Sequence, residues 1–173
     1  MTLQEIQALI RDVPDFPKPG ILFKDITPLL AHPKAFKATI SHLADQLDGK
    51  PLDGILGIES RGFIFGAALA QQLGVPLQLV RKQGKLPRAA ISIRYELEYG
   101  YDHLEMHADA IAPGGRYAIV DDLIATGGTA AATARLVAQQ QGTVASCLFV
   151  IELGFLDGRK ALEGFPVSSL LRY

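Results

Sequence analysis

The sequence predicts an α/β protein with a mainly parallel, twisted sheet that is flanked by helices. Two observations predict this class. Short apolar runs alternate along the chain with segments of helical spacing, which is the pattern of a parallel sheet with helices on its faces. The segment 90–111 instead alternates apolar and polar residues with a period of two, which predicts an antiparallel arm that projects from this sheet.

The composition is that of one globular domain over residues 1–173. Hydrophobic residues make up 49% of the chain and charged residues 20%, which is enough apolar material for a core. A net charge of −1 predicts no large basic surface for nucleic acid. The one cysteine, Cys147, lies in an apolar run and is expected to be a buried free thiol. No apolar run reaches the roughly 20 residues that span a bilayer, so we expect a cytoplasmic protein without membrane partners.

The N-terminal part is predicted to hold two helices and a short extended piece. Apolar residues with helical spacing predict a helix over 3–13 and an amphipathic helix over 33–47. A Pro-rich connection follows the first helix, and residues 21–30 predict an extended piece that reaches a turn near Pro28.

The later elements follow the alternation of strands and helices. Strands are expected at 53–60, 75–82, 117–122 and 143–153. A helix is expected over 61–74, closed by Gly74, and an Ala-rich helix follows the loop at 125–129. In the arm, Ile91, Ile93, Tyr95, Leu97 and Tyr99 form the apolar side, and Gly100 and Asp102 are expected to turn the chain.

Two adjacent aspartates, Asp121 and Asp122, end the strand expected at 117–122. Burying an unpaired carboxylate costs several kcal/mol, and no cation is adjacent in sequence to compensate this pair. Beyond them, Ala125, Thr126, Gly127, Gly128 and Thr129 have little side-chain bulk, so a ligand can approach their backbone. The helix that follows directs free N–H groups at the same space, which suits a phosphate. We therefore expect a sugar phosphate here, with solvent exposure of the aspartates as the alternative.

The stretch VDDLIATGGT resembles the phosphoribosyl diphosphate signature of the type I phosphoribosyltransferases. The stretches DFPKPGILFKDITPLL, GIESRGFIFGAALA, VRKQGKLP, and LEYG followed by LEMHADAI resemble, in order, the members of that family that act on adenine. The resemblance implies the type I phosphoribosyltransferase fold, with a small base-binding hood formed by about residues 1–33. It also implies transfer of the phosphoribosyl group from phosphoribosyl diphosphate to adenine, giving AMP and diphosphate, with Mg²⁺, by a cytoplasmic homodimer.

The resemblance further assigns roles to individual residues. The 5′-phosphate falls to Ala125, Thr126, Gly127, Gly128 and Thr129. The diphosphate falls to Glu59, Ser60, Arg61, Arg81, Lys82 and Lys85, and adenine falls to Leu22, Phe23 and Lys24. The implied catalytic residues are Glu98, Asp121, Asp122 and Arg61, with Tyr99 closing over the site. Mg²⁺ would be carried by the substrate, so no side chain is assigned as a direct metal ligand.

The residues taken alone leave alternatives open. The basic loop at 81–88 could be simply solvated, Phe23 could belong to the core, and Glu96 and Glu98 could form a solvent face. Two other functions also fit the signature: a regulator that senses phosphoribosyl diphosphate and binds nucleic acid, and a transferase for another purine base. The slightly negative net charge favours a transferase over a regulator.

Overall fold

The structure is a computed structural model that describes residues 1–96 and 100–173. These residues form two compact units, 1–42 and 43–173. Leu97, Glu98 and Tyr99 lie outside the described residues. Within the described part, no helix has the length and apolar character needed to cross a membrane.

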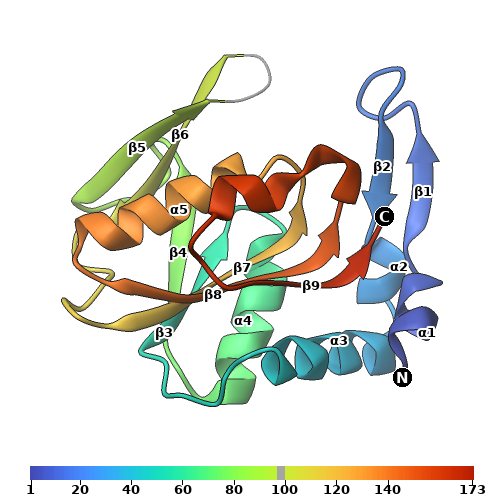
Figure 1. The fold of residues 1–173 in the computed structure, drawn as a ribbon, viewed down its shortest axis with the longest axis horizontal. Coiled ribbons are helices and arrows are strands. Elements are labelled where there is room, and N and C mark those ends of the chain that lie inside the picture. The colour runs from blue at the N-terminus through green and yellow to red at the C-terminus, as the bar shows by residue number, and fades with distance from the viewer. Residues whose placement is uncertain (97–99) are drawn as a thin grey trace. The chain divides into compact units, whose positions relative to one another are not determined.

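The N-terminal unit contains a two-stranded sheet and short helices (Figure 1). Its elements are α1 (Leu3–Gln7), β1 (Arg11–Pro14), β2 (Leu22–Asp25), α2 (Thr27–Leu30) and the beginning of α3 (Pro33–Asp45). A capping box starts α1, because Thr2 Oγ1 accepts a hydrogen bond from the backbone N–H of Glu5, and the Glu5 carboxylate accepts one from the N–H of Thr2.

The helix expected over 3–13 is wrong in its second half. The helix ends at Gln7, and β1 pairs antiparallel with β2, with Val13 opposite Phe23. Pairing with a strand distant in sequence therefore overrides a helical spacing that covers only three turns. The helix expected over 33–47 is confirmed as α3.

The large unit is built on a seven-stranded sheet of order β5-β6-β4-β3-β7-β8-β9. Its strands are β3 (Gly54–Ile58), β4 (Leu77–Lys82), β5 (Ala90–Glu96), β6 (Tyr101–His107), β7 (Arg116–Ile124), β8 (Thr143–Glu152) and β9 (Val167–Arg172). In the sheet, the neighbouring strands β4, β3, β7, β8 and β9 pair in parallel, and β5 and β6 form an antiparallel arm (Figure 1). This arrangement confirms the predicted fold class. The strand β9 was not among the elements expected from the sequence.

Helices cover both faces of this sheet. The helices are α4 (Gly62–Leu73), α5 (Gly128–Gln139) and two 3-10 helices, η1 (Gly154–Leu156) and η2 (Gly158–Leu162). Gly74 ends α4 with a φ of 67°, as expected of a glycine that closes a helix. Gly66 of α4 approaches the backbone of Gly57, which places α4 on the face of β3 opposite to Leu56 and Ile58.

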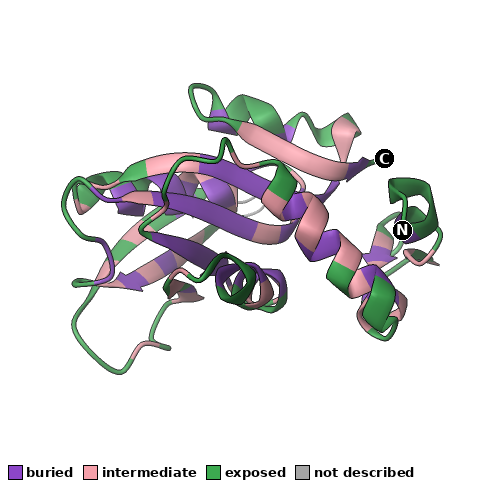
Figure 2. Cartoon of the chain, turned by 90° about the horizontal axis from the view of Figure 1, so that it is seen from below, coloured by how far each residue is buried: buried purple, intermediate pink, exposed green. Residues whose placement is uncertain are grey.

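The core of the large unit lies between α5 and the sheet. Leu56, Ile119 and Phe149 come from β3, β7 and β8 and pack with Leu136 of α5, and each is at most 1% exposed. The central strands carry much of the buried surface (Figure 2). Cys147 is buried in this core as expected, and burial raises the pKa of its thiol to about 12.

Candidate active site

Asp121 and Asp122 lie inside β7 and not at its end, which corrects the expected strand boundary. The parallel pairing of β7 with β3 stops at Val120, opposite Gly57. The pairing with β8 continues to Ile124, which keeps the backbone extended beyond the aspartates. Because the pairing with β3 stops before Asp121, the two carboxylates lie beyond the paired part of the neighbouring strand, where a ligand has room.

A pocket of about 230 Å³ opens at this point. Its lining combines the aspartate pair, the loop 125–129 and one arginine from a different strand–helix connection. The lining residues are Arg61, Asp121, Asp122, Leu123, Ile124, Ala125, Thr126, Gly127, Gly128, Thr129, Ala130 and Phe149. The structure thus brings together the residues that the sequence assigned to the 5′-phosphate, both aspartates and Arg61.

The loop presents backbone donors to this pocket. Gly127 adopts a φ of 81° and precedes the first residue of α5, and no side chain among the described residues caps that helix end. The first turn of an α-helix leaves its N–H groups without partners inside the helix, so the amides of Gly128, Thr129 and Ala130 are available to an anion. The favourable helix dipole adds about 0.3–1 kcal/mol, which leaves most of the binding to these donors.

The aspartate pair carries unusual electrostatics. Arg61 Nη2 lies 2.8 Å from Asp122 Oδ2, and Asp121 Oδ1 accepts a 2.8 Å hydrogen bond from the backbone N–H of Asp122. Burial raises the pKa of Asp121 well above its ordinary value, and the adjacent charge of Asp122 raises it further. Burial also raises the pKa of Asp122, while the Arg61 guanidinium opposes that rise.

Gly62 is a site residue that sequence reasoning missed. A Cβ at this position would lie 2.7 Å from Asp121 Oδ1 and 2.8 Å from the carbonyl oxygen of Val120. Only a residue without a side chain lets the start of α4 approach β7 so closely. The signal in the sequence is a glycine directly after Arg61, at the start of the helix expected over 61–74.

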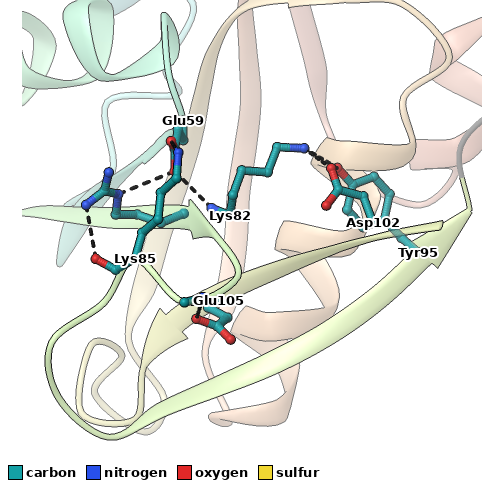
Figure 3. A network of polar contacts seen from close by, with 8 residues as sticks. Glu59, Lys82, Lys85, Tyr95, Asp102 and Glu105 are labelled. Atoms are coloured by element: carbon teal, nitrogen blue, oxygen red, sulfur yellow. Dashed lines mark hydrogen bonds and ion pairs between the residues drawn. The ribbon is translucent and has the colours of Figure 1, made fainter.

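Three of the four cations assigned to diphosphate are gathered at the carboxyl ends of β3 and β4, namely Arg81, Lys82 and Lys85 (Figure 3). Glu59 is their centre: its Oε2 accepts hydrogen bonds from Arg81 Nε at 3.3 Å and from the Lys82 backbone N–H at 2.9 Å. Its Oε1 accepts a hydrogen bond from Lys85 Nζ. Burial of Glu59 works against ionisation, but the donors of Lys85 and Lys82 outweigh it and lower the pKa of this carboxyl. The peptide bond between Glu59 and Ser60 is cis.

Lys82 makes a second connection, to the arm. Its Nζ donates to Asp102 of β6 and, at 3.2 Å, to the hydroxyl of Tyr95 on β5 (Figure 3). Burial lowers the pKa of Lys82, but the hydrogen bonds to Asp102 and Tyr95 outweigh this and raise it overall. Asp102 and Tyr95 were not assigned to the site. Their position near Lys82 could not be predicted, because the local sequence pattern does not show that β6 pairs with β4.

The residues assigned to adenine lie on β2 in the N-terminal unit. Leu22 is exposed, and Phe23 is half-buried and meets the ring of Phe16 edge-on, with centroids 5.1 Å apart. Lys24 is buried, and its Nζ lies 2.5 Å from Asp12 Oδ1. Phe23 is therefore neither fully in a core nor fully open. Glu98 and Tyr99, the residues assigned to acid–base chemistry and to closure, lie outside the described residues.

The described residues contain no group of three or more His, Cys, Asp or Glu side chains that could enclose a metal ion. The carboxylates nearest to a ligand in the pocket are Asp121 and Asp122. Two oxygen donors of this kind suit an ion that arrives bound to a substrate and retains several waters.

Comparison with known proteins identifies close relatives. The phosphoribosyl transferase domain matches residues 26–162. An adenine phosphoribosyltransferase of Synechococcus sp. (strain JA-2-3B'a(2-13)) is 60% identical over 96% of this chain and 97% of its own. The crystal structure of adenine phosphoribosyltransferase from Thermoanaerobacter pseudethanolicus superposes with a TM-score of 0.97 at 55% identity, covering 99% of this chain and 100% of that one. The enzyme from Saccharomyces cerevisiae, solved with adenine and an imino-altritol bisphosphate, gives a TM-score of 0.92 at 44% identity, covering 98% of both chains.

Proposed function

The chain belongs to the phosphoribosyl transferase domain family, and on this premise we propose that it transfers the 5-phosphoribosyl group of phosphoribosyl diphosphate to adenine, giving AMP and diphosphate. The observation that carries the proposal is one pocket in which an amide-lined helix start meets two adjacent carboxylates. This pairing matches the two ends of a ribose 5-phosphate, since the amides suit the phosphate and the carboxylates suit the hydroxyls.

The carboxylates also suit the reaction itself. As the bond between C1′ and diphosphate breaks, positive charge develops on the ribose ring. Asp121 and Asp122 lie in a buried environment where their negative field acts strongly on that charge. Arg61 keeps Asp122 paired in the absence of substrate and so limits the cost of holding two carboxylates side by side.

The departing diphosphate needs cations. Arg81, Lys82 and Lys85 are held by the carboxylates of Glu59 and Asp102 at the ends of β3, β4 and β6. A diphosphate carries more negative charge than either carboxylate. These cations can therefore exchange their carboxylate contacts for contacts with diphosphate by moving their side chains. Mg²⁺ belongs to the phosphoribosyl diphosphate as part of the substrate, and Asp121 and Asp122 are the oxygen donors that would face it.

Adenine recognition and proton transfer are assigned by resemblance to family members. Phe23 would stack on the base, and backbone groups of Leu22 and Lys24 would read its edge. Glu98 would assist proton transfer near N7, with Tyr99 closing over the bound base. We expect Glu98→Gln to lower kcat at least tenfold with a smaller change in the KM for adenine. An unchanged kcat would remove Glu98 from the chemistry. The cytoplasm and a homodimer are the proposed setting of this activity.

A base-specificity assay tests the function. Radiolabelled adenine, hypoxanthine, guanine and xanthine are supplied separately with phosphoribosyl diphosphate and Mg²⁺. Nucleotide formation from adenine, at least a hundredfold faster than from any other base, is the expected result. Preference for another base would reassign the substrate. Failure to use any base, combined with binding to nucleic acid, would instead support the sensing regulator.

A further inference from the structure

The loop that lines the phosphate pocket rests against a segment about 30 residues further along the chain. A Cβ on Gly127 would lie 2.1 Å from the carbonyl oxygen of Gly158, and a Cβ on Gly158 would lie 2.2 Å from the carbonyl oxygen of Ala125. Both distances are far shorter than any real contact, so the two glycines allow the loop backbone and the start of η2 to touch directly. The back of the phosphate loop is therefore fixed by the position of η2.

An ion pair between the buried Glu152 and the half-exposed Arg159 fixes η2 in turn. Arg159 Nε lies 3.0 Å from both Glu152 carboxylate oxygens, and its Nη2 lies 2.7 Å from Oε2. Glu152 is the last residue of β8 and is 4% exposed. Its position is set by the sheet, so the pair ties η2 to the end of β8.

The same guanidinium also reaches β9. Arg159 Nη1 donates to the carbonyl oxygen of Val167 at 2.8 Å, and Nη2 donates to Ser169 Oγ at 2.9 Å. Ser169 itself donates to Glu152. Leu162, at the end of η2, is 1% exposed and belongs to the main core. The short helix is thus held at one end by Arg159 and at the other by apolar packing.

We propose that Gly158, Arg159 and Glu152 are positioning residues for the 5′-phosphate of the substrate. This inference rests on the proposed function of the pocket. A loop of Ala, Thr and Gly has many accessible backbone conformations, and ordering it on binding would weaken affinity. Contact with η2 restricts the loop backbone before the ligand binds. The Glu152–Arg159 pair holds η2 against the sheet and so keeps the loop in that conformation.

Ligand titrations of the full chain separate this role from a general effect on folding. Ribose 5-phosphate carries the phosphate that the loop would bind, whereas Mg²⁺-diphosphate lacks it. We expect Arg159→Gln to weaken ribose 5-phosphate about tenfold by calorimetry and to leave the affinity for Mg²⁺-diphosphate within twofold. In the assay, the KM for phosphoribosyl diphosphate should rise about tenfold while kcat at saturation changes less than twofold.

A matched control lies on the same short helix. Lys160 pairs with Asp157 at 2.7 Å, and both side chains are largely exposed, at 81% and 63%. Lys160→Gln should therefore leave both affinities unchanged. Gly158→Ala should give a larger loss of ribose 5-phosphate affinity than Arg159→Gln, and the arginine variant carries the test if the alanine variant does not fold.

Two results would overturn the inference. One is an unchanged affinity for ribose 5-phosphate in a folded Arg159→Gln variant whose melting temperature has fallen, because that would make the pair a stabilising contact only. The other is an equal loss of ribose 5-phosphate and Mg²⁺-diphosphate affinity. Failure of the unaltered protein to bind ribose 5-phosphate would be a different outcome, since it would contradict the proposed function and the inference together.

Discussion

Arg61 and Asp122 form an ion pair across the junction of α4 and β7, with 2.8 Å between Nη2 and Oδ2. Arg61 immediately precedes α4, and Asp122 is 5% exposed within β7. Arg61 is assigned to diphosphate and Asp122 to ribose, so this ion pair connects the two parts of the proposed site directly.

Removing the arginine should disturb both stability and the acid limb of the pH–rate profile. Arg61→Gln leaves the buried Asp122 carboxylate without its counter-ion, so the pKa of Asp122 rises further. We expect a loss of about 1–2 kcal/mol in unfolding free energy, since Arg61 is partly exposed to solvent. The acid limb of kcat/KM should move to higher pH. Arg88→Gln, which breaks an exposed pair with Asp109, is the control, and an identical profile for both variants would contradict the role of Arg61.

The carboxylate of Asp121 should support activity while lowering the stability of the fold. Its pKa is raised, so the folded state binds its proton more tightly than the unfolded state, and stability falls as pH rises through the interval between the two pKa values. Asp121→Asn removes this charge and keeps an oxygen to accept the N–H of Asp122. We expect the ligand-free variant to be more stable at pH 7 by about 1 kcal/mol, or about 2–4 °C in Tm, with at least tenfold lower kcat. A lower Tm in the asparagine variant would show that the carboxylate is stabilising.

The close approach of α4 to β7 should make Gly62 intolerant of any side chain. The added methyl group of Gly62→Ala would collide with Asp121 Oδ1 and with the backbone of Val120. Displacing the aspartate should reduce kcat/KM at least tenfold and destabilise the fold by about 1–3 kcal/mol. Ala67→Ser, an exposed substitution on the same helix, should change neither quantity. Normal kinetics for Gly62→Ala would mean that the contact has no bearing on the site.

Glu59 should contribute stability that disappears in acid. Its pKa is lowered in the folded protein, so its contribution is complete above the ordinary pKa of a glutamate and is lost as pH falls through the folded value. Urea unfolding at pH 7 should show Glu59→Gln to be less stable than the unaltered protein by about 1 kcal/mol. The difference should shrink as the pH falls through the lowered pKa of Glu59. A difference that stays constant with pH would exclude an ionic contribution.

Much of the fold could be predicted from the sequence because its signals are local. The apolar runs of β3 and β8, the helical spacing of α3 and the Ala-rich composition of α5 lie within single elements, and each of these elements was predicted. The failures are of another kind. Residues 11–14 form a strand because Val13 meets Phe23. The continuation of β7 past Asp122 depends on β8, and β9 depends on its pairing with β8.

The same difference between local and long-range signals applies to the residues of the site. The loop 125–129 and the aspartate pair lie in one short stretch of the sequence, so their chemistry could be predicted before their geometry was known. The contacts of Gly62 with Asp121, of Lys82 with Asp102, and of Gly158 with the loop join residues that are far apart in the chain. No local pattern carries such contacts, and a glycine required for close approach looks in a sequence like any other glycine.

The most direct test of the central claim is a crystal structure of the protein with AMP. The account predicts the phosphate of AMP within hydrogen-bond distance of the backbone amides at 126–129, with the ribose hydroxyls facing Asp121 and Asp122. A nucleotide bound with its phosphate elsewhere, while the loop and the start of α5 remain open, would contradict it.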